Sequence, residues 1–325
     1  MTRVSSVPAS CRGLIARNVG KGYNTAMFIV GVFCGLASQM NQYAFMLTLK
    51  KLYPGVQVKM AVGGDWLKKL EHNGYELDSA FGIPPERASK AEINRLANFY
   101  PGSGPVARLR TVAKFFLLRY GLKKSRQVTL ADPTAPYPDL YRLNPAEDVL
   151  FWSNYDTSIY HLVEAELRQA FSFAKLPKPP DVRRLAEVIA ADESSVAVHV
   201  RRGDYITYGY DVLGEDYYRT AFDEMEARVS SPRYYVFSDD PKAARELMAH
   251  VRPNADCRFM EGHFGRSGCY DMWLMSLCRN NVIANSGFSY WGAWLNDHPN
   301  KVVIGPRKHV SWCKCPVSWD GWLQV

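Results

Sequence analysis

The feature that most constrains this chain is a short apolar run that ends directly in charged residues. The run Val196–Val200 has the β-branched composition of a buried strand, and Arg201, Arg202, Gly203 and Asp204 follow it immediately. In an open α/β sheet, ligands bind where strands end at their carboxyl edge. Two adjacent guanidinium groups at such an edge offer planar donors that match phosphate oxygens. The segment therefore predicts an anion-binding loop rather than a solvated surface ion pair.

The residues around the two arginines are expected to shape this loop. Gly203 lets the backbone turn tightly or lets a ligand come close. Asp204 is expected to be the ionic partner of Arg202, which then organises the loop. Asp204 and His199 are also candidates for acid–base catalysis. Because His199 still lies within the strand pattern, a buried structural role is favoured for it over a catalytic one.

Strand and helix patterns alternate on both sides of Lys175–Pro180, a stiff segment that breaks helices. Before it, strands over 27–33 and 56–62 enclose a helix over 38–52, and a helix over 158–173 follows a less regular stretch. After it, the sequence predicts strand 195–200, helix 216–229, strand 233–237, helix 241–250, helix 269–279, strand 281–284, helix 288–297 and strand 301–304. Strands that alternate with helices imply parallel sheets.

These patterns divide the 325 residues into three parts. Residues 1–26 form a basic extension without acidic residues, which we expect to be mobile. Residues 27–176 form an N-terminal Rossmann-like domain and residues 177–325 a C-terminal one. A chain of this length is long enough to build two hydrophobic cores.

The formal net charge of +8 favours anionic partners. No Lys- or Arg-rich run of the kind that follows a nucleic-acid backbone occurs, so nucleic acid is not expected as a partner. No apolar stretch reaches the roughly 18–20 residues that span a bilayer, and the first 25 residues lack the apolar core of a signal peptide. We therefore expect a cytoplasmic protein, with peripheral contact to the inner membrane surface as an open alternative.

Neither the cysteines nor the carboxylates follow a metal-binding pattern. The seven cysteines have no framework spacing and are expected to be reduced. No Asp-x-Asp, His-Glu-x-x-His or zinc spacing occurs, so neither a metal nor a cofactor is expected. Asp239 and Asp240 are adjacent, so that in extended backbone one would face a ligand and the other the scaffold.

A second candidate anion site follows the strand predicted over 281–284. Asn285, Ser286, Phe288 and Ser289 stand where the strand gives way to a helix. Hydroxyl groups and backbone N–H groups at a helix N-terminus bind anions. The alternative is that Ser286 only caps the helix.

Four motifs in the same order carry a family resemblance. The segment His199–Asp204 resembles the His-x-Arg-Arg-x-Asp signature shared by α1,2-, α1,6- and protein O-fucosyltransferases. The block Asp271–Asn296 resembles the donor-side block of the α1,2-fucosyltransferases, glycosyltransferase family 11, almost residue for residue. Tyr235–Asp240 and Asp216–Tyr218 also match that family in the expected order. The chain resembles a bacterial-type member.

The resemblance implies an α/β fold of the GT-B type, with two Rossmann-like doubly wound domains and a cleft between them. It implies an inverting, metal-independent enzyme that moves L-fucose from GDP-β-L-fucose to the 2-hydroxyl of a galactose-containing acceptor. The C-terminal domain would bind the GDP-sugar and the N-terminal domain the acceptor. The resemblance places Arg201 at the β-phosphate and these further residues at the donor: Arg202, Gly35, Ser38, Gln39, Asp239, Asp240, Asp271, Asn285, Ser286, Phe288 and Ser289.

The N-terminal loop departs from the family pattern. Where the family has Gly-Gly-Leu-Gly-Asn-Gln-Met-Phe, residues 34–41 read Cys-Gly-Leu-Ala-Ser-Gln-Met-Asn. In the family this loop faces the sugar and phosphates of the donor, so a same-fold transferase with another GDP-sugar, acceptor or linkage stays open. A more remote alternative is a non-catalytic α/β protein that binds phosphate or RNA through its basic surface.

Overall fold

The computed structural model describes residues 26–63, 73–99, 104–124, 126–128, 140, 143–152, 157–210, 212–307 and 321–325. The chain forms two compact units: unit 1 comprises Met1–Tyr75 and Pro84–Leu167, and unit 2 comprises Glu76–Ile83 and Arg168–Val325. Of the basic extension predicted over residues 1–26, all but Ala26 lies outside the described residues, as do Cys11, Cys313 and Cys315.

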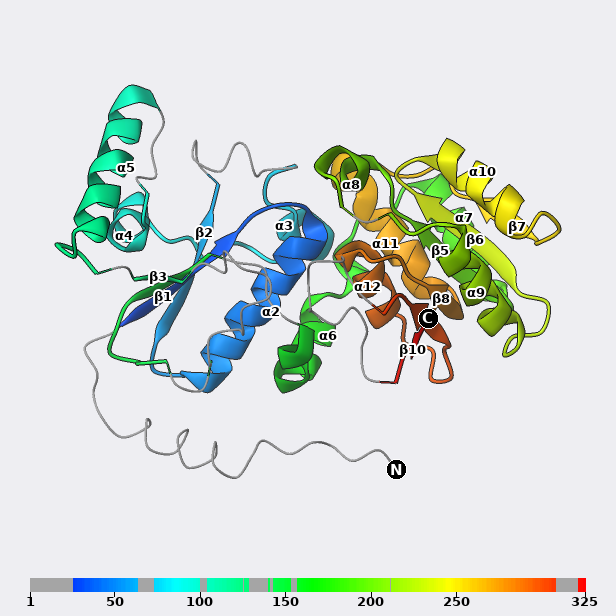
Figure 1. The fold of residues 1–325 in the computed structure, drawn as a ribbon. Coiled ribbons are helices and arrows are strands. Elements are labelled where there is room, and N and C mark those ends of the chain that lie inside the picture. The colour runs from blue at the N-terminus through cyan, green and yellow to red at the C-terminus, as the bar shows by residue number, and fades with distance from the viewer. Residues whose placement is uncertain are drawn as a thin grey trace. The chain divides into compact units, whose positions relative to one another are not determined.

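Unit 1 is built on a parallel sheet of the order β2-β1-β4-β3 (Figure 1). Its strands are β1 (Met27–Val32), β2 (Gln57–Val62), β3 (Gln127–Val128) and β4 (Val149–Phe151). Every residue of β1 is buried, because this strand is apolar throughout and has a neighbour on each side. The predicted strands over 27–33 and 56–62 are thereby confirmed.

The helical segments of unit 1 include both α-helices and a 3₁₀ segment. They are α2 (Leu36–Leu52), α4 (Lys90–Leu96), α5 (Gly104–Arg119), a 3₁₀ segment η2 (Thr157–Val163) and the first part of α6 (Glu164–Ala170), which continues past the end of unit 1 at Leu167. The single α-helix predicted over 158–173 is wrong. The residues Thr157–Tyr160, which include β-branched and aromatic side chains, form a 3₁₀ turn, and the chain leaves the helix before Ser172, which caps the next turn.

Cys34 is a strained residue of unit 1. It connects β1 to α2 with a φ of 63°, a left-handed conformation that costs a non-glycine residue roughly 1–2 kcal/mol. We expect Cys34→Gly to raise the free energy of unfolding by about 1 kcal/mol, since part of the gain is offset by the entropy of glycine in the unfolded chain. Thermal unfolding of unit 1 measures this, and Cys34→Ser, which keeps the strain, should give no gain. Equal stability of the two variants would contradict the strain argument.

Unit 2 contains a larger parallel sheet of the order β10-β9-β8-β5-β6-β7. Its strands are β5 (Ser195–Val200), β6 (Arg233–Ser238), β7 (Cys257–Phe259), β8 (Asn280–Val282), β9 (Val303–Gly305) and β10 (Leu323–Gln324). Its helical segments are α3 (Leu77–Phe81), η3 (Phe173–Lys175), α7 (Pro180–Ala191), α8 (Gly203–Tyr208), α9 (Glu215–Glu226), α10 (Pro241–Val251), η4 (Gly265–Ser267), α11 (Gly268–Leu277) and α12 (Gly287–Trp294).

Helices cover both faces of this sheet (Figure 1). Val196, Val198 and Val200 pack on one face in a cluster with buried residues of α9 and α10. Ala197, between them, packs on the other face with residues of α7 and α11. This alternation explains why β5 is apolar throughout. Two α/β units with parallel sheets confirm the expected GT-B fold class.

The start of unit 2 lies before the domain boundary predicted at residue 177. The main part of unit 2 begins at Arg168, and the unit also includes the short segment Glu76–Ile83. Within this unit, Phe81 on α3 packs against Phe171 and Phe173, with ring centroids 5.0 and 5.1 Å apart. These aromatic contacts give α3 its place in the core of unit 2.

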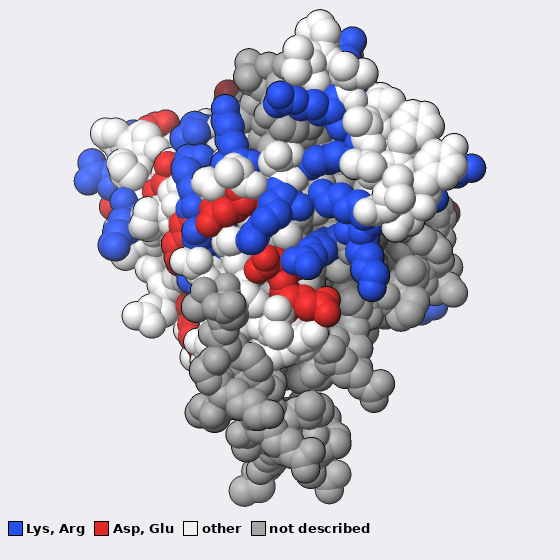
Figure 2. All heavy atoms as spheres, turned by 90° about the vertical axis from the view of Figure 1, so that its left-hand side faces the viewer, with Lys and Arg blue, Asp and Glu red and all other residues white. Residues whose placement is uncertain are grey.

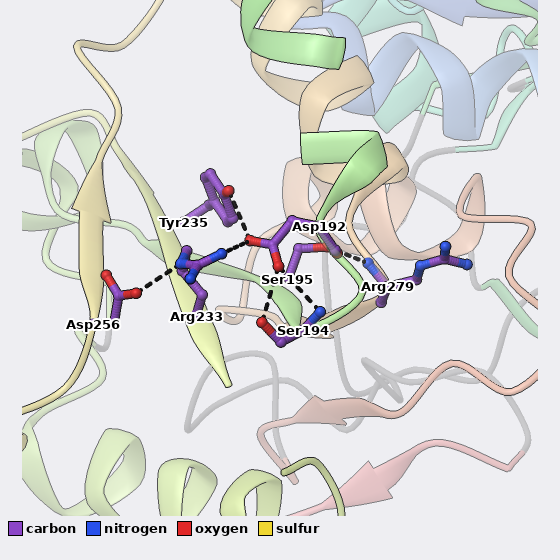
Figure 3. Close-up of polar contacts among 7 residues, drawn as sticks. All are labelled: Asp192, Ser194, Ser195, Arg233, Tyr235, Asp256 and Arg279. Carbon is purple, nitrogen blue, oxygen red and sulfur yellow. Dashed lines mark hydrogen bonds and ion pairs between the residues drawn. The ribbon is translucent and has the colours of Figure 1, made fainter. Parts of the chain in front are cut away.

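A polar network closes the amino edge of the unit 2 sheet (Figure 3). Asp192 accepts hydrogen bonds from Arg233 at 2.8 Å and from Tyr235 at 2.9 Å, and its backbone carbonyl accepts one from the hydroxyl of Ser195. That hydroxyl in turn accepts the backbone N–H of Arg279. Burial would raise the pKa of Asp192, but the hydrogen bonds outweigh it and hold this pKa below its usual value. The network fixes the starts of β5, β6 and β8 relative to one another.

Among the described helices, none combines the length and the apolar character that crossing a bilayer requires.

Candidate active site

The candidate site lies at the carboxyl edge of the unit 2 sheet, opposite the Asp192 network. β5 pairs in parallel with β6 on one side and β8 on the other. The loops that follow these three strands therefore meet at one edge. They contain most of the residues that the sequence predicts for the site, namely Arg201, Arg202, Asp204, Asp239, Asp240, Asn285, Ser286, Phe288 and Ser289.

Arg201 is held between two carboxylates. Its terminal nitrogen lies 2.7 Å from Asp204 Oδ1, and its Nε lies 3.3 Å from Asp239 Oδ2; both contacts are ion pairs without hydrogen-bond geometry. The Arg201 guanidinium also lies 5.5 Å from the ring centroid of Tyr205. About a quarter of the Arg201 side chain, 24%, stays exposed. The group is therefore fixed in direction and still accessible to a ligand.

The predicted pairing of Asp204 with Arg202 is wrong. Asp204, in the first turn of α8, pairs with Arg201, which directly precedes the N-cap residue Arg202. Arg202 is held instead through its backbone N–H, which donates to Asp239 Oδ1 at 2.8 Å. No carboxylate of the described residues lies within ion-pair distance of the Arg202 guanidinium.

Gly203 is required by the position of Asp239. A Cβ atom at residue 203 would lie 2.4 Å from Asp239 Oδ2 and 3.1 Å from its carboxyl carbon. Asp239 thus lies against three consecutive residues of the loop. It forms an ion pair with the side chain of Arg201, accepts the backbone N–H of Arg202 and leaves no room for a side chain at Gly203. Asp240 points elsewhere and caps α10 by accepting the N–H of Ala243 at 3.0 Å. The structure therefore brings Asp239, but not Asp240, to the arginines.

The N-terminus of α12 forms the next part of the site. Ser286 caps the helix by accepting the N–H of Phe288 at 3.3 Å. Ser289 is completely buried, and its hydroxyl bonds backbone atoms of Ala284 and Ser286. These two serines are thus engaged in building the turn between β8 and α12.

Tyr205 connects the arginine loop to the α12 turn. Its hydroxyl donates to the backbone carbonyl of Asn285 at 2.7 Å. Burial, which outweighs the opposing charge of Arg201, raises the pKa of Tyr205 to about 12. The phenol therefore stays protonated and keeps the two loops together at neutral pH.

His199 is a buried, neutral histidine. Burial, assisted by the charge of Arg201, lowers the pKa of His199 to about 3. Its side chain lies against Phe288, with ring centroids 5.8 Å apart, and its backbone carbonyl accepts the hydroxyl of Tyr218. Among the described residues, none makes a hydrogen bond to its Nδ1. The geometry places His199 beneath the arginine loop, where an imidazole with so low a pKa is a weak base.

Asp271, on α11, binds a residue that the sequence does not single out. Its carboxylate accepts the backbone N–H of His263 at 3.0 Å and contacts the His263 Nδ1 at 2.5 Å. Asp271 is buried, whereas His263 is partly exposed. The loop residue His263 thus lies closer to solvent than the predicted Asp271. The flanking Gly262 and Gly265, both with positive φ, mark the loop in the sequence but give no hint of this pairing.

His263 gives unit 2 a pH dependence of known sign. The hydrogen bond to Asp271 raises the pKa of His263 above its usual value, although burial opposes the shift. A raised pKa adds stability that is complete below the unfolded pKa of about 6.5 and is lost as the pH rises through the folded value. We expect urea unfolding of the wild type to lose more stability than that of His263→Gln as the pH rises above about 6.5. Parallel pH profiles would contradict the pairing.

Three further predicted donor residues, Gly35, Ser38 and Gln39, lie in unit 1 at the start of α2. Gln39 is buried, and its side-chain amide donates to the carbonyls of Cys34 and Gly74, both at 2.8 Å. Gly35 is the N-cap residue, and no side chain caps the helix at that position. Gln39 therefore holds the loop after β1, and Ser38 stays partly exposed beside it.

No group of three or more His, Cys, Asp or Glu side chains within the described ranges could hold a metal ion. Metal independence stays a prediction.

Two α/β units with parallel sheets, and a pair of arginines at a strand end of the second, define a GT-B type protein with an anion-binding loop. A family model described as Glycosyl transferase family 11 matches residues 182–310, which carry all of this edge. This part of the chain is thus similar to glycosyltransferase family 11.

Three relatives show how far the similarity extends. The O-antigen biosynthesis glycosyltransferase WbnK of Escherichia coli is 36% identical over 156 residues, 45% of this chain and 49% of that protein. An alpha-1,2-colitosyltransferase of Escherichia coli is 31% identical over 185 residues, 53% of this chain and 61% of that protein. A galactoside alpha-(1,2)-fucosyltransferase 1 of Oryctolagus cuniculus is 26% identical over 268 residues, 79% of this chain and 61% of that protein. The chain thus spans about half to three fifths of the length of these relatives.

The solved structure of the fucosyltransferase NodZ from Bradyrhizobium aligns with 83% of this chain and 92% of its own, with a TM-score of 0.46 and 15% identity. The fold class rests on the two parallel sheets themselves.

Proposed function

We propose that this chain is an inverting, metal-independent glycosyltransferase that moves L-fucose from GDP-β-L-fucose to the 2-hydroxyl of a terminal galactoside. The observation that carries the proposal is the arginine loop: Arg201 is oriented by Asp204 and Asp239 at the carboxyl edge of a parallel sheet. Such an edge is where α/β proteins bind nucleotides. In this proposal unit 2 holds the nucleotide and unit 1 the acceptor.

The chemistry needs stabilisation of a leaving diphosphate. The bond between C1 of fucose and the β-phosphate oxygen breaks, and a bond from C1 to the acceptor oxygen forms on the opposite face. Negative charge grows on the β-phosphate as GDP leaves, and a fixed guanidinium stabilises that charge in the transition state. Arg201 fits this role, because two carboxylates fix its direction while only some of its five N–H donors are engaged.

The acceptor proton needs a destination. A buried His199 with a pKa of about 3 is a poor base, and the Asp204 carboxylate is engaged by Arg201. If the C1–O bond breaks early, the sugar becomes oxocarbenium-like and little help from a base is needed. We therefore propose that the acceptor hydroxyl loses its proton late, through solvent water, to the departing diphosphate on the opposite face of the sugar.

The remaining predicted donor residues divide into two groups. Arg202, whose guanidinium has no ion-pair partner among the described residues, is proposed to contact the diphosphate together with the N-terminus of α12. Asp271 is proposed to act through His263, because its carboxylate is engaged by that residue. Asp240 and Ser289 are proposed to support the loops that bind the donor.

A second candidate function is transfer of another GDP-linked deoxysugar. Two observations favour it: the changed loop at residues 34–41, whose Cys34 keeps a left-handed backbone without glycine, and the similarity to an alpha-1,2-colitosyltransferase. Both candidate functions use the same arginine loop, and they differ in the sugar that is transferred.

The test is transfer to a set of galactosides from GDP-fucose and from other GDP-deoxysugars, with the product linkage determined by NMR. An α1,2-fucosylated product supports the proposal, and preference for another GDP-sugar selects the second candidate. A protein that consumes no donor but binds RNA in a salt-dependent way is instead the non-catalytic binding protein.

Metal removal is a separate test of the mechanism. Because a guanidinium rather than a divalent ion is proposed to stabilise the leaving group, we expect full activity in excess EDTA. Initial rates before and after chelation measure this. Activity that disappears with EDTA and returns with Mn²⁺ or Mg²⁺ would show that the leaving group depends on a metal.

A further inference from the structure

Helix α5 presents an apolar stripe to solvent. Of its described side chains only Ala107 is buried. Leu109, Val112, Phe116 and Tyr120, the last just beyond the helix, are spaced three and four residues apart and therefore follow one side of the helix. Leu109 is 70% and Tyr120 69% exposed. A surface helix normally shows the reverse pattern, with its apolar stripe against the core.

The opposite side of α5 is the side that packs on unit 1. Ala107, Thr111, Lys114 and Leu118 form this packed stripe, which is buried or half-buried. The Lys114 ammonium donates to the side-chain oxygen of Asn94 at 2.6 Å and to three backbone carbonyls at the end of α4. The helix is thus anchored by a polar contact, and its apolar stripe points outward.

The chain segment that carries this stripe is basic. Residues 93–131 contain eight lysines and arginines and no acidic residue. Asp148 forms ion pairs with Arg95 and Arg126, two of these basic residues. Arg108 and Arg119, on α5 itself, have no carboxylate within ion-pair distance among the described residues. Figure 2, which looks at the side that carries α5, shows Lys and Arg gathered next to uncharged atoms.

We propose that α5 is a membrane-docking helix that lies flat on an anionic phospholipid surface. Its outward apolar stripe would enter the acyl boundary, and the arginines beside the stripe would reach the lipid phosphates, as in interfacial helices. The 16-residue helix presents a strip about 24 Å long at 1.5 Å per residue. A second copy of the chain fits less well, since this face would then meet an equally basic face. The inference is independent of which sugar the chain transfers.

The experiment is co-sedimentation of the full chain with phosphatidylcholine vesicles, with and without phosphatidylglycerol. We expect binding that requires phosphatidylglycerol and weakens with salt. The double variants Leu109→Gln/Phe116→Gln and Arg108→Glu/Arg119→Glu should each bind roughly tenfold or more weakly. The matched control is Arg183→Glu/Val188→Gln on α7, which changes one exposed charge and one exposed apolar residue and should bind as the wild type does.

Circular dichroism and transfer to a water-soluble acceptor separate docking from misfolding. The α5 variants should keep both their helical content and this activity, because α5 contributes no residue to the proposed active site. Equal binding to vesicles without anionic lipid, or equal binding by wild type and variants, overturns the proposal. Self-association that Leu109→Gln/Phe116→Gln abolishes, without vesicle binding by the wild type, assigns the stripe to a second copy instead.

Discussion

Arg201→Lys is expected to lower kcat by about two orders of magnitude or more, the scale seen when one charge-stabilising donor is removed from an active site. Lysine keeps the positive charge but loses the planar fork. The Arg201 guanidinium pairs with both Asp204 and Asp239. A lysine ammonium cannot pair with both carboxylates in this way and also bind a phosphate. Binding of GDP should weaken less than turnover, because the interaction is strongest when the phosphate charge develops.

Single-turnover transfer and GDP titration on the same protein measure the two effects separately. Arg202→Lys is the matched variant, since Arg202 is the adjacent residue and is held through its backbone N–H. We expect it to affect GDP binding more than turnover. Turnover of Arg201→Lys close to that of the wild type would remove Arg201 from the mechanism.

Asp204→Asn distinguishes a positioning residue from a base. If Asp204 only orients Arg201, the asparagine variant still offers one oxygen to the guanidinium and should lose less turnover than Arg201→Ala. Its pH–rate profile should keep the shape of the wild-type profile. A variant that binds GDP normally yet loses as much turnover as Arg201→Ala would identify Asp204 as the base.

The parallel sheet of unit 2 could be predicted because its signal is local. β5 and β6 are short apolar runs buried on both faces, and such runs are recognisable without knowing their neighbours. The sequence also places the arginine loop directly after β5. The partners of the arginines were not predictable in the same way. Asp239 follows a different strand, and only the parallel pairing of β5 with β6 brings it to the loop.

Helix α5 and His263 escaped prediction for a different reason. An apolar stripe along a helix is expected to face a core. The stripe on α5 faces outward instead, and the stretch that contains it is interpreted from the sequence as less regular. His263 depends on Asp271, which is eight residues away on a separate helix. In both cases the decisive contact is tertiary, and the periodicity of apolar residues along the chain does not predict it.

Gly203→Ala is expected to lower kcat/KM by about a hundredfold, the effect of displacing a catalytic group by roughly 1 Å. The added Cβ would lie 2.4 Å from Asp239 Oδ2, so the carboxylate must move. That movement removes the acceptor of the Arg202 N–H and the second ion-pair partner of Arg201. Loss of one partly buried hydrogen bond should also cost about 1–3 kcal/mol of stability.

Gly214→Ala is the matched control, because a Cβ at Gly214 meets no atom within 4 Å, and its φ of −96° suits any residue. Steady-state kinetics and thermal unfolding of both variants separate lost activity from lost folding. Asp239→Asn should weaken the same contacts without steric displacement and so fall between the wild type and Gly203→Ala. If Gly203→Ala is as active as Gly214→Ala, Asp239 does not hold the arginine loop in its active geometry. Because Asp239 makes three contacts with this loop, we expect Gly203→Ala to be much less active than Gly214→Ala.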